Sequence, residues 1–164
     1  MSVETVKAYL SEFGMQDRVL EFPVSSATVE LAAQAAGVIP ARIAKTLSFL
    51  VEERCVLVVT AGDAKIDNGR FKAQFHTKAK MLSPEQVGRL VGHPVGGVCP
   101  FAVPASVEVY LDVSLRRFET VFPACGSGNS AIELTCGELE HCSRARGWID
   151  VCKAWREEEK EASV

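Results

Sequence analysis

The sequence predicts one domain of the α+β class, built on a mixed sheet or partly open barrel with helices around it. Helical and extended segments interleave along the whole chain, and 164 residues with 48% hydrophobic content suit a single core. The late strand candidates 107–112, 120–125 and 131–134 follow one another too closely for parallel crossovers, so they predict an antiparallel meander. The domain is expected to span residues 1–155, and the acidic tail 156–164 is expected to be disordered.

Helices are predicted where apolar residues recur at helical spacing between capping residues. In the clearest case Ser83 caps a helix, Pro84 occupies its first turn and Gln86 completes a capping box. The predicted helical segments are 3–13, 25–37, 40–45, 68–75, 83–92 and 135–144. Apart from the three late strands, the strand candidates are 19–24, 46–51, 55–62 and 148–152.

Composition and charge narrow the function classes. The net charge of −3 argues against general nucleic-acid coating, and no DNA partner is expected. The N-terminus carries Glu4 and Lys7, and no apolar run approaches membrane-spanning length, so neither a signal peptide nor a membrane partner is expected. Six cysteines without a CxxC pair favour reduced thiols and a cytoplasmic protein. Because His76, His93 and His141 stand far apart, no metal site and no cofactor are predicted.

One basic stretch contrasts with the acidic balance of the chain. Residues 65–80 hold five lysine or arginine side chains and a single acidic residue, Asp67. A solvated face is the more common explanation for such a run. A patch that steers a phosphate backbone is the alternative, and the sequence leaves both open.

Lys45 is the most unusual polar residue of the chain. It stands directly before the apolar run 46–51, three residues after Arg42. Lysine is almost never fully buried unless it is paired, so one interpretation is that the side chain reaches to the surface. The other is that its ammonium group lies at the mouth of a pocket and meets an anion.

Two glycine-containing loops are further candidates for a site. Gly96 and Gly97 permit positive φ or close backbone approach, and Pro100 stiffens the chain after them. The loop 126–130 interrupts a pair of strands. Neither loop has the spacing of a phosphate-binding fingerprint, so a tight turn and a hairpin loop are the simpler explanations.

Cys99 is a candidate nucleophile in the first of these loops. His93 precedes it by six residues, and a base must touch a thiol to activate it. A small buried core residue is the alternative reading of the same cysteine.

The order of four motifs resembles the YbaK/EbsC family of aminoacyl-tRNA deacylases, which are free-standing relatives of the editing domain of bacterial prolyl-tRNA synthetases. The resemblance covers about residues 22–139, most of the chain. The motifs are RIAKTLSF, AGDAKID, VGGVCPF and FPACGSGNSAIELT. The resemblance implies a partly open barrel surrounded by helices. It also implies hydrolysis of the ester between a mischarged amino acid and the terminal ribose of tRNA, with tRNA(Pro) as the expected tRNA.

The resemblance implies roles for individual residues. Lys45 matches the lysine that faces the substrate pocket, and it is the predicted catalytic residue. The residues expected to bind substrate are Thr28, Gly96, Gly97, Cys99, Pro100, Ser127 and Asn129. Two departures matter: PFA replaces the PFG of many relatives, and ACGSGN replaces the HPxxN of alanine-specific editors. The second departure argues against a histidine-dependent mechanism and against alanine specificity.

The implied partners are the acceptor end of mischarged tRNA and an aminoacyl-tRNA synthetase. With tRNA as the ligand, Arg70, Lys72 and Lys78 become the predicted tRNA contacts. An aminoacyl ester is already activated, so a charged hydrogen bond from Lys45, assisted by loop amides, could stabilise the oxyanion while water or a substrate group attacks. Two alternatives remain: a non-catalytic module that binds an aminoacyl or nucleotide end, and a Cys99-dependent hydrolase of small esters.

Overall fold

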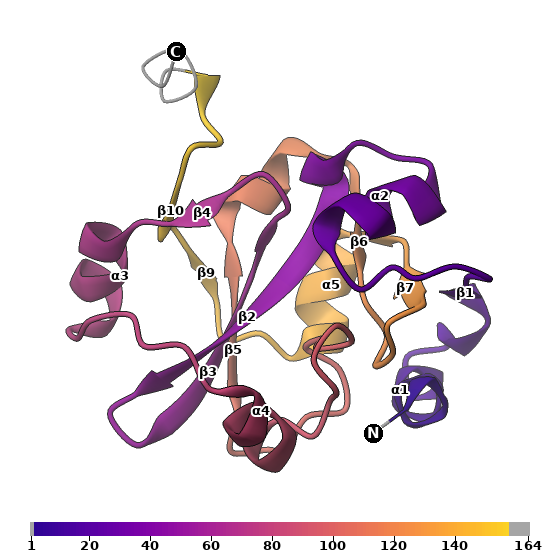
Figure 1. Ribbon diagram of the computed structural model, residues 1–164, viewed down its shortest axis with the longest axis horizontal. Helices are drawn as coiled ribbons and strands as arrows, with labels where there is room; N and C mark the ends of the chain where they lie inside the picture. The colour runs from indigo at the N-terminus through magenta and orange to yellow at the C-terminus, as the bar shows by residue number, and fades with distance from the viewer. Residues whose placement is uncertain (1, 158–164) are drawn as a thin grey trace.

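The predicted α+β class is confirmed. The computed structural model describes residues 2–157, and Figure 1 shows helices arranged around a curled, partly open sheet. The strand order in this six-stranded sheet is β8-β6-β2-β3-β5-β9. Its strands are β2 (Ile43–Val51), β3 (Arg54–Ala61), β5 (Glu108–Asp112), β6 (Thr120–Pro123), β8 (Leu134–Thr135) and β9 (Trp148–Ile149). The long β2–β3 hairpin is therefore the centre of the fold.

The hairpin forms because both strands are rich in β-branched and aliphatic residues, which suit a pleated, buried surface. Residues 56–59 of β3 are completely buried. β2 begins at Ile43 and not at the predicted residue 46, since the helical turn before it is only the short 3₁₀ helix η2 (Pro40–Arg42). Lys45 consequently lies inside the strand, opposite Thr60 of β3.

The predicted antiparallel meander of the late strands is wrong. β5 pairs parallel with β3, whereas β6 pairs parallel with β2, so the two strands lie on opposite sides of the hairpin. The 3₁₀ helix η3 (Val113–Arg117) and the residues after it carry the chain from one side to the other. β5 and β6 are not neighbours in the sheet, because β2 and β3 lie between them. The short connection from β5 to β6 therefore does not require these two strands to pair with each other. Antiparallel pairing survives between β6 and β8.

The helices begin at recognisable caps. The capping box predicted at Ser83 with Gln86 is confirmed, and a second capping box forms at Thr135 with Glu138. The helix predicted over 68–75 is capped by Asp67, whose carboxylate accepts the backbone N–H of residue 70 at 2.9 Å. The α-helices of the described chain are α1 (Val3–Ser11), α2 (Val29–Ala36), α3 (Asn68–Phe75), α4 (Pro84–Leu90) and α5 (Cys136–Ser143).

Two small antiparallel sheets complete the fold. In one of them β1 (Val19–Glu21), which follows the short 3₁₀ helix η1 (Gln16–Arg18), pairs with β7 (Ser130–Ile132). In the other, β4 (Lys65–Ile66) pairs with β10 (Cys152–Lys153). The predicted strand 148–152 is thus divided, since β9 joins the main sheet and β10 leaves it.

The helices cover the sheet unevenly, and this leaves room for a site. α3 packs through a run of aromatic contacts, with the Phe49 and Phe71 rings 4.8 Å apart and the Phe71 and Phe75 rings 4.7 Å apart. α2 forms a separate small cluster with the start of β2 and with Phe122. Between these two packed regions β2 remains accessible.

Most of the tail that was predicted to be disordered, residues 158–164, lies outside the described residues. Arg156 is described, and its guanidinium binds the Asp150 carboxylate at 2.6 Å. No helix among residues 2–157 is both long enough and apolar enough to cross a membrane.

Candidate functional site

A cavity of about 310 Å³ opens along β2, between the start of α2, α4 and the loop 95–98. Its walls are predominantly apolar, and Met81 and Val95 at its edge are 58% and 70% exposed. The polar residues that line it are Ser26, Thr28, Lys45, Thr46, Ser48 and Ser130. Lys45 is the one charged side chain among the described lining residues. The cavity therefore offers one cation and several hydroxyl groups on an apolar background.

Lys45 lines the cavity while its ammonium group is held by backbone carbonyls. Nζ donates to the carbonyl oxygen of Ala64 at 2.6 Å and makes a longer bond of 3.5 Å to that of Gly62. Burial lowers the pKa of Lys45, and the negative charge of Asp63 opposes this shift. An ammonium group has three N–H donors, so two bonds to carbonyls leave one donor for a ligand.

The turn 61–64 approaches Lys45 closely because residue 62 has no side chain. A Cβ atom on Gly62 would lie 2.1 Å from the carbonyl oxygen of Pro40 and 2.7 Å from Cγ1 of Val29. Real Cβ atoms do not approach other atoms this closely. Gly62 thus lets the turn pack against η2 and α2, and it brings the two carbonyl oxygens to the wall of the cavity.

The loop with two glycines also reaches the cavity. Gly96 lines the cavity, has a φ of 93° and would place a Cβ atom 3.1 Å from Cβ of Ala27. A Cβ atom on Gly97 would lie 2.7 Å from the backbone nitrogen of Ser127. The two glycines therefore bring three segments together that are far apart in the sequence: the strand-to-helix segment before α2, this loop and the loop 126–130.

The predicted substrate-binding residues fall into two groups. Thr28 and Gly96 line the cavity, and Thr28 also caps α2 by accepting the N–H of Leu31 at 3.2 Å. The others lie outside the lining: Gly97, Cys99, Pro100, Ser127 and Asn129. The substrate contacts assigned to this second group stay predictions.

Ser127 and Asn129 reach the cavity only through a neighbour. The Ser127 hydroxyl lies 2.9 Å from Oδ1 of Asn129 and 2.7 Å from Oγ of Ser130, which itself lines the cavity. The Asn129 amide donates to the carbonyl oxygen of Phe22 at 3.1 Å. These bonds fix the loop 126–130 against the segment that precedes α2.

Cys99 and His93 touch, as the thiol hypothesis requires, but their environment opposes reactivity. Sγ of Cys99 lies 3.5 Å from Nε2 of His93, and the cysteine is fully buried, which raises its pKa to about 12. Nε2 of His93 lies 2.7 Å from the carbonyl oxygen of Phe101. A carbonyl can only accept, so this nitrogen carries the proton and donates it to Phe101. Nε2 of His93 therefore cannot act as a base for the Cys99 thiol. The two side chains form a buried contact in the core of the protein.

The predicted tRNA contacts lie away from the cavity lining. Arg70 on α3 forms an ion pair of 3.1 Å with Asp150, so part of its charge is neutralised. Lys72 and Lys78 are exposed. The predicted basic face is therefore carried by exposed lysines more than by Arg70, and its role in binding stays a prediction.

Several lining residues were not singled out from the sequence. Thr46 and Ser48 gave a usable signal, because they are polar residues in an otherwise apolar strand next to Lys45. Ser26 and Thr46 each have a buried hydroxyl oxygen for which the described residues provide no partner. Met81 and Val95 gave no signal, since only the tertiary fold brings them to the cavity.

Among residues 2–157, no cluster of three or more histidine, cysteine or acidic side chains is positioned to hold a metal ion. Fold and site together define a small α+β half-barrel protein with a lysine in the wall of an apolar cavity. The chain belongs to the aminoacyl-tRNA editing domain family, which matches residues 24–142. This match confirms the resemblance drawn from the four motifs.

Individual relatives agree with this assignment. The chain is 54% identical over 156 residues to the uncharacterized protein YwhH of Bacillus subtilis, covering 94% of this chain and 99% of that one. It is 31% identical over 90 residues to proline–tRNA ligase of Thermotoga maritima, covering 54% of this chain but 15% of the ligase. A solved structure described as a candidate trans-editing enzyme for prolyl-tRNA synthetase matches with a TM-score of 0.82 and 29% identity, covering 91% of this chain and 95% of that one.

Proposed function

We propose that the protein is a trans-acting aminoacyl-tRNA deacylase that hydrolyses the ester bond of mischarged tRNA. The observation that carries the proposal is the Lys45 ammonium group in the wall of an apolar cavity, in a chain of the editing-domain family. The expected tRNA is tRNA(Pro). Support comes from the similarity to proline–tRNA ligase and to the candidate trans-editing enzyme for prolyl-tRNA synthetase.

The reaction needs little chemistry from the protein. Water, or a group of the substrate, adds to the ester carbonyl, the bond to the ribose oxygen breaks, and the ribose hydroxyl leaves with a proton. Negative charge develops on the former carbonyl oxygen in the transition state. The free N–H of Lys45 offers a charge-assisted hydrogen bond to that oxygen, in a cavity whose apolar walls strengthen it.

The cavity also suits the task of a second sieve. Its volume of about 310 Å³ is at the lower end of the range for small-molecule pockets, roughly 300–1,000 Å³. A synthetase gains only about 1–3 kcal/mol from one methylene group, so small misactivated amino acids escape its first selection. A separate apolar cavity that admits a small or medium side chain can remove them.

The proposed ligand is the acceptor end of charged tRNA, with the aminoacyl group in the cavity and the phosphates outside it. The exposed basic residues of the stretch 65–80 are the proposed phosphate contacts. A synthetase is a further proposed partner, because a free-standing editor must meet the mischarged tRNA before the tRNA leaves for the ribosome. The proposed location is the cytoplasm.

The test is a panel of mischarged tRNAs incubated with the purified protein. The panel contains tRNA(Pro) charged with amino acids of increasing size, and the same amino acids on unrelated tRNAs. We expect hydrolysis of at least one small or medium aminoacyl ester, strongest on tRNA(Pro), and loss of that hydrolysis in the Lys45→Ala variant. Tight binding of the panel without any hydrolysis would favour the non-catalytic binding module instead.

A further inference from the structure

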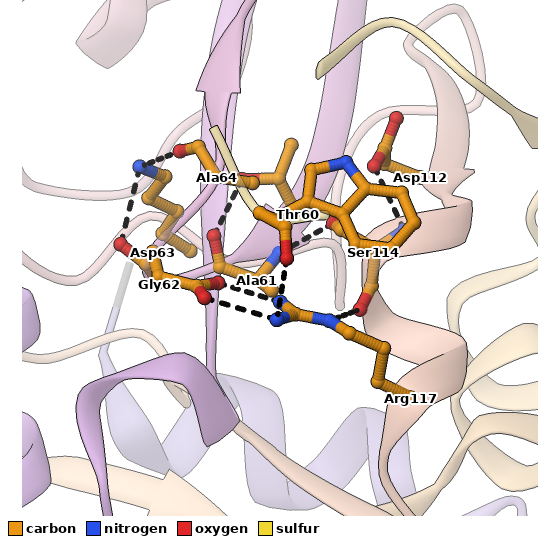
Figure 2. Close-up of polar contacts among 10 residues, drawn as sticks. Thr60, Ala61, Gly62, Asp63, Ala64, Asp112, Ser114 and Arg117 are labelled. Carbon is orange, nitrogen blue, oxygen red and sulfur yellow. Dashed lines mark hydrogen bonds and ion pairs between the residues drawn. The ribbon is translucent and has the colours of Figure 1, made fainter. Parts of the chain in front are cut away.

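The turn that holds Lys45 is itself held by an ion pair. Asp63 stands between the two residues whose carbonyls bind Lys45, and Figure 2 shows the Arg117 guanidinium directed at its carboxylate. The two groups form a double contact, with Nη1 at 3.0 Å from Oδ2 and Nη2 at 2.6 Å from Oδ1. Such a forked geometry fixes orientation as well as distance.

The other end of Arg117 is anchored to the sheet. Its Nε donates to the carbonyl oxygen of Ser114 at 2.9 Å, and the Ser114 hydroxyl accepts the N–H of Ala61 at 3.1 Å (Figure 2). Asp112 is completely buried at the end of β5 and accepts the N–H groups of Ser114 and Val151, each at 2.9 Å. The turn 61–64 is thus tied at both its start and its middle to η3.

We propose that Arg117 is a positioning residue for Lys45: by binding Asp63 it fixes the turn 61–64, so that the carbonyls of Gly62 and Ala64 hold the Lys45 ammonium group in the cavity wall. The catalytic consequence rests on the proposed deacylase function. The positioning itself is a property of the fold and can be measured without any substrate. This arrangement gives Arg117, on the far side of the turn from Lys45, an effect on a reaction that it does not touch.

The ion pair also changes the charge that acts on Lys45. The charged groups that act on Lys45 are Asp63, Lys65 on β4 and Glu30 on α2. Cys152 on β10 also faces it, but burial raises the pKa of that thiol far above its usual range, so it stays neutral. Because the Arg117 guanidinium offsets part of the Asp63 charge, its loss would strengthen the effect of the Asp63 carboxylate on the ammonium group.

The experiment compares the variants Arg117→Gln and Asp63→Asn, using the full chain with ¹³C-labelled lysine to follow the titration of Lys45 by NMR. Amide hydrogen exchange in the same samples reports the turn itself. Both variants break the double contact, so the N–H of Ala64, which donates to the carbonyl oxygen of Ala61 at 3.1 Å inside the turn, should exchange about tenfold faster in both. A purely electrostatic effect would shift the Lys45 pKa upward in Arg117→Gln and downward in Asp63→Asn and would leave this exchange rate unchanged.

Kinetics supply the second readout. On the preferred mischarged tRNA, Arg117→Gln should lower kcat about tenfold with KM within about twofold of wild type, as expected for a group that acts through the transition state. Arg117→Lys should recover part of the loss, since it keeps the charge without the fork. The matched control is Arg116→Gln, because the neighbouring guanidinium lies over the Trp148 ring at 4.2 Å, and it should behave as wild type.

The outcomes are separable. If the Ala64 N–H exchanges at the wild-type rate in both variants, or if Arg117→Gln leaves kcat at the wild-type value, the positioning role is wrong. If wild-type protein hydrolyses no member of the panel, the proposed function fails, while the exchange rate of the Ala64 N–H still decides whether Arg117 fixes the turn that holds Lys45.

Discussion

The turn 61–64 and the loop 95–101 are two regions that each present a candidate reactive side chain, and they differ in access. Lys45, held by the turn, lines a cavity and keeps one N–H free. Cys99, in the loop, has no exposed surface and sits against a histidine nitrogen that already donates elsewhere. Burial lowers the pKa of Lys45 and raises the pKa of Cys99. Lys45 still contacts the cavity, whereas the Cys99 thiol is inaccessible.

The absence of a glycine side chain has opposite effects on access in the two regions. Gly62 removes a side chain so that backbone carbonyls can reach Lys45 next to the cavity. Gly97 removes one so that its loop can close on the backbone of Ser127. A reactive residue type beside glycine therefore does not define a site, because the same close packing can create access or remove it.

Lys45→Ala should have the largest effect. We expect deacylation of the preferred mischarged tRNA to fall about a hundredfold, equivalent to about 3 kcal/mol of transition-state stabilisation. Single-turnover kinetics measure this loss, and circular dichroism checks that the fold is intact. The matched control is Lys153→Ala, an exposed lysine on β10 outside the cavity lining and outside the stretch 65–80, which should keep wild-type activity. Wild-type turnover by Lys45→Ala would contradict the assignment.

Gly62→Ala should destabilise the fold by about 1–3 kcal/mol, because its Cβ atom would lie 2.1 Å from the Pro40 carbonyl oxygen and the turn must move away from η2 and α2. Urea unfolding measures the change. Gly88→Ala is the matched control, since nothing lies within 4 Å of its Cβ position inside α4, and it should stabilise the protein by up to about 1 kcal/mol. Equal effects of the two substitutions would mean that Gly62 does not position the turn.

Neutralising Arg70, Lys72 and Lys78 together should weaken tRNA binding and flatten its dependence on salt, because fewer counterions are released. Titrations of tRNA at several salt concentrations measure both quantities. Hydrolysis of a small aminoacyl ester without the tRNA body should hardly change, since Lys45 is untouched. Because Arg70 is paired with Asp150, Lys72→Gln with Lys78→Gln should reproduce most of the effect. Unchanged affinity and salt slope would make the run a solvated face.

Cys99→Ala should have the smallest effect on activity, within about threefold of wild type, because a thiol with a pKa of about 12 is not ionised at neutral pH. Its cost should appear in stability instead, since the side chain is fully buried. Deacylation kinetics and thermal unfolding separate the two. Trapping of an acyl group on Cys99 would support the thiol hydrolase in place of the lysine site.

Local signals predicted most elements of the fold but not their arrangement. A capping box can be recognised from the sequence because it involves residues only three positions apart. The starts of α4 and α5 are examples, with Ser83 and Gln86 in one box and Thr135 and Glu138 in the other. The parallel pairing of β5 and β6 with the central hairpin could not be predicted, since it depends on contacts between segments far apart in the chain.

The site shows the same division. The motif around Lys45 identified the cation, and the adjacent Thr46 and Ser48 could have been added to the cavity from the strand pattern. The motif AGDAKID contains Gly62, Asp63 and Ala64, but its link to Lys45 depends on the register of the hairpin, which places Lys45 opposite Thr60 and next to this turn. Arg117 gives no local signal either, because its contact with Asp63 joins residues 54 positions apart.

The most direct test of the cavity assignment is to map the binding of a non-hydrolysable analogue, an amino acid joined by an amide to the 3′ position of adenosine, by NMR. The account predicts the largest shifts at Lys45, Thr28 and Gly96, which line the cavity, and small shifts at Cys99. Shifts concentrated at Cys99 and His93, or on the distant surface around His141 and Arg144, with Lys45 unaffected, would contradict it.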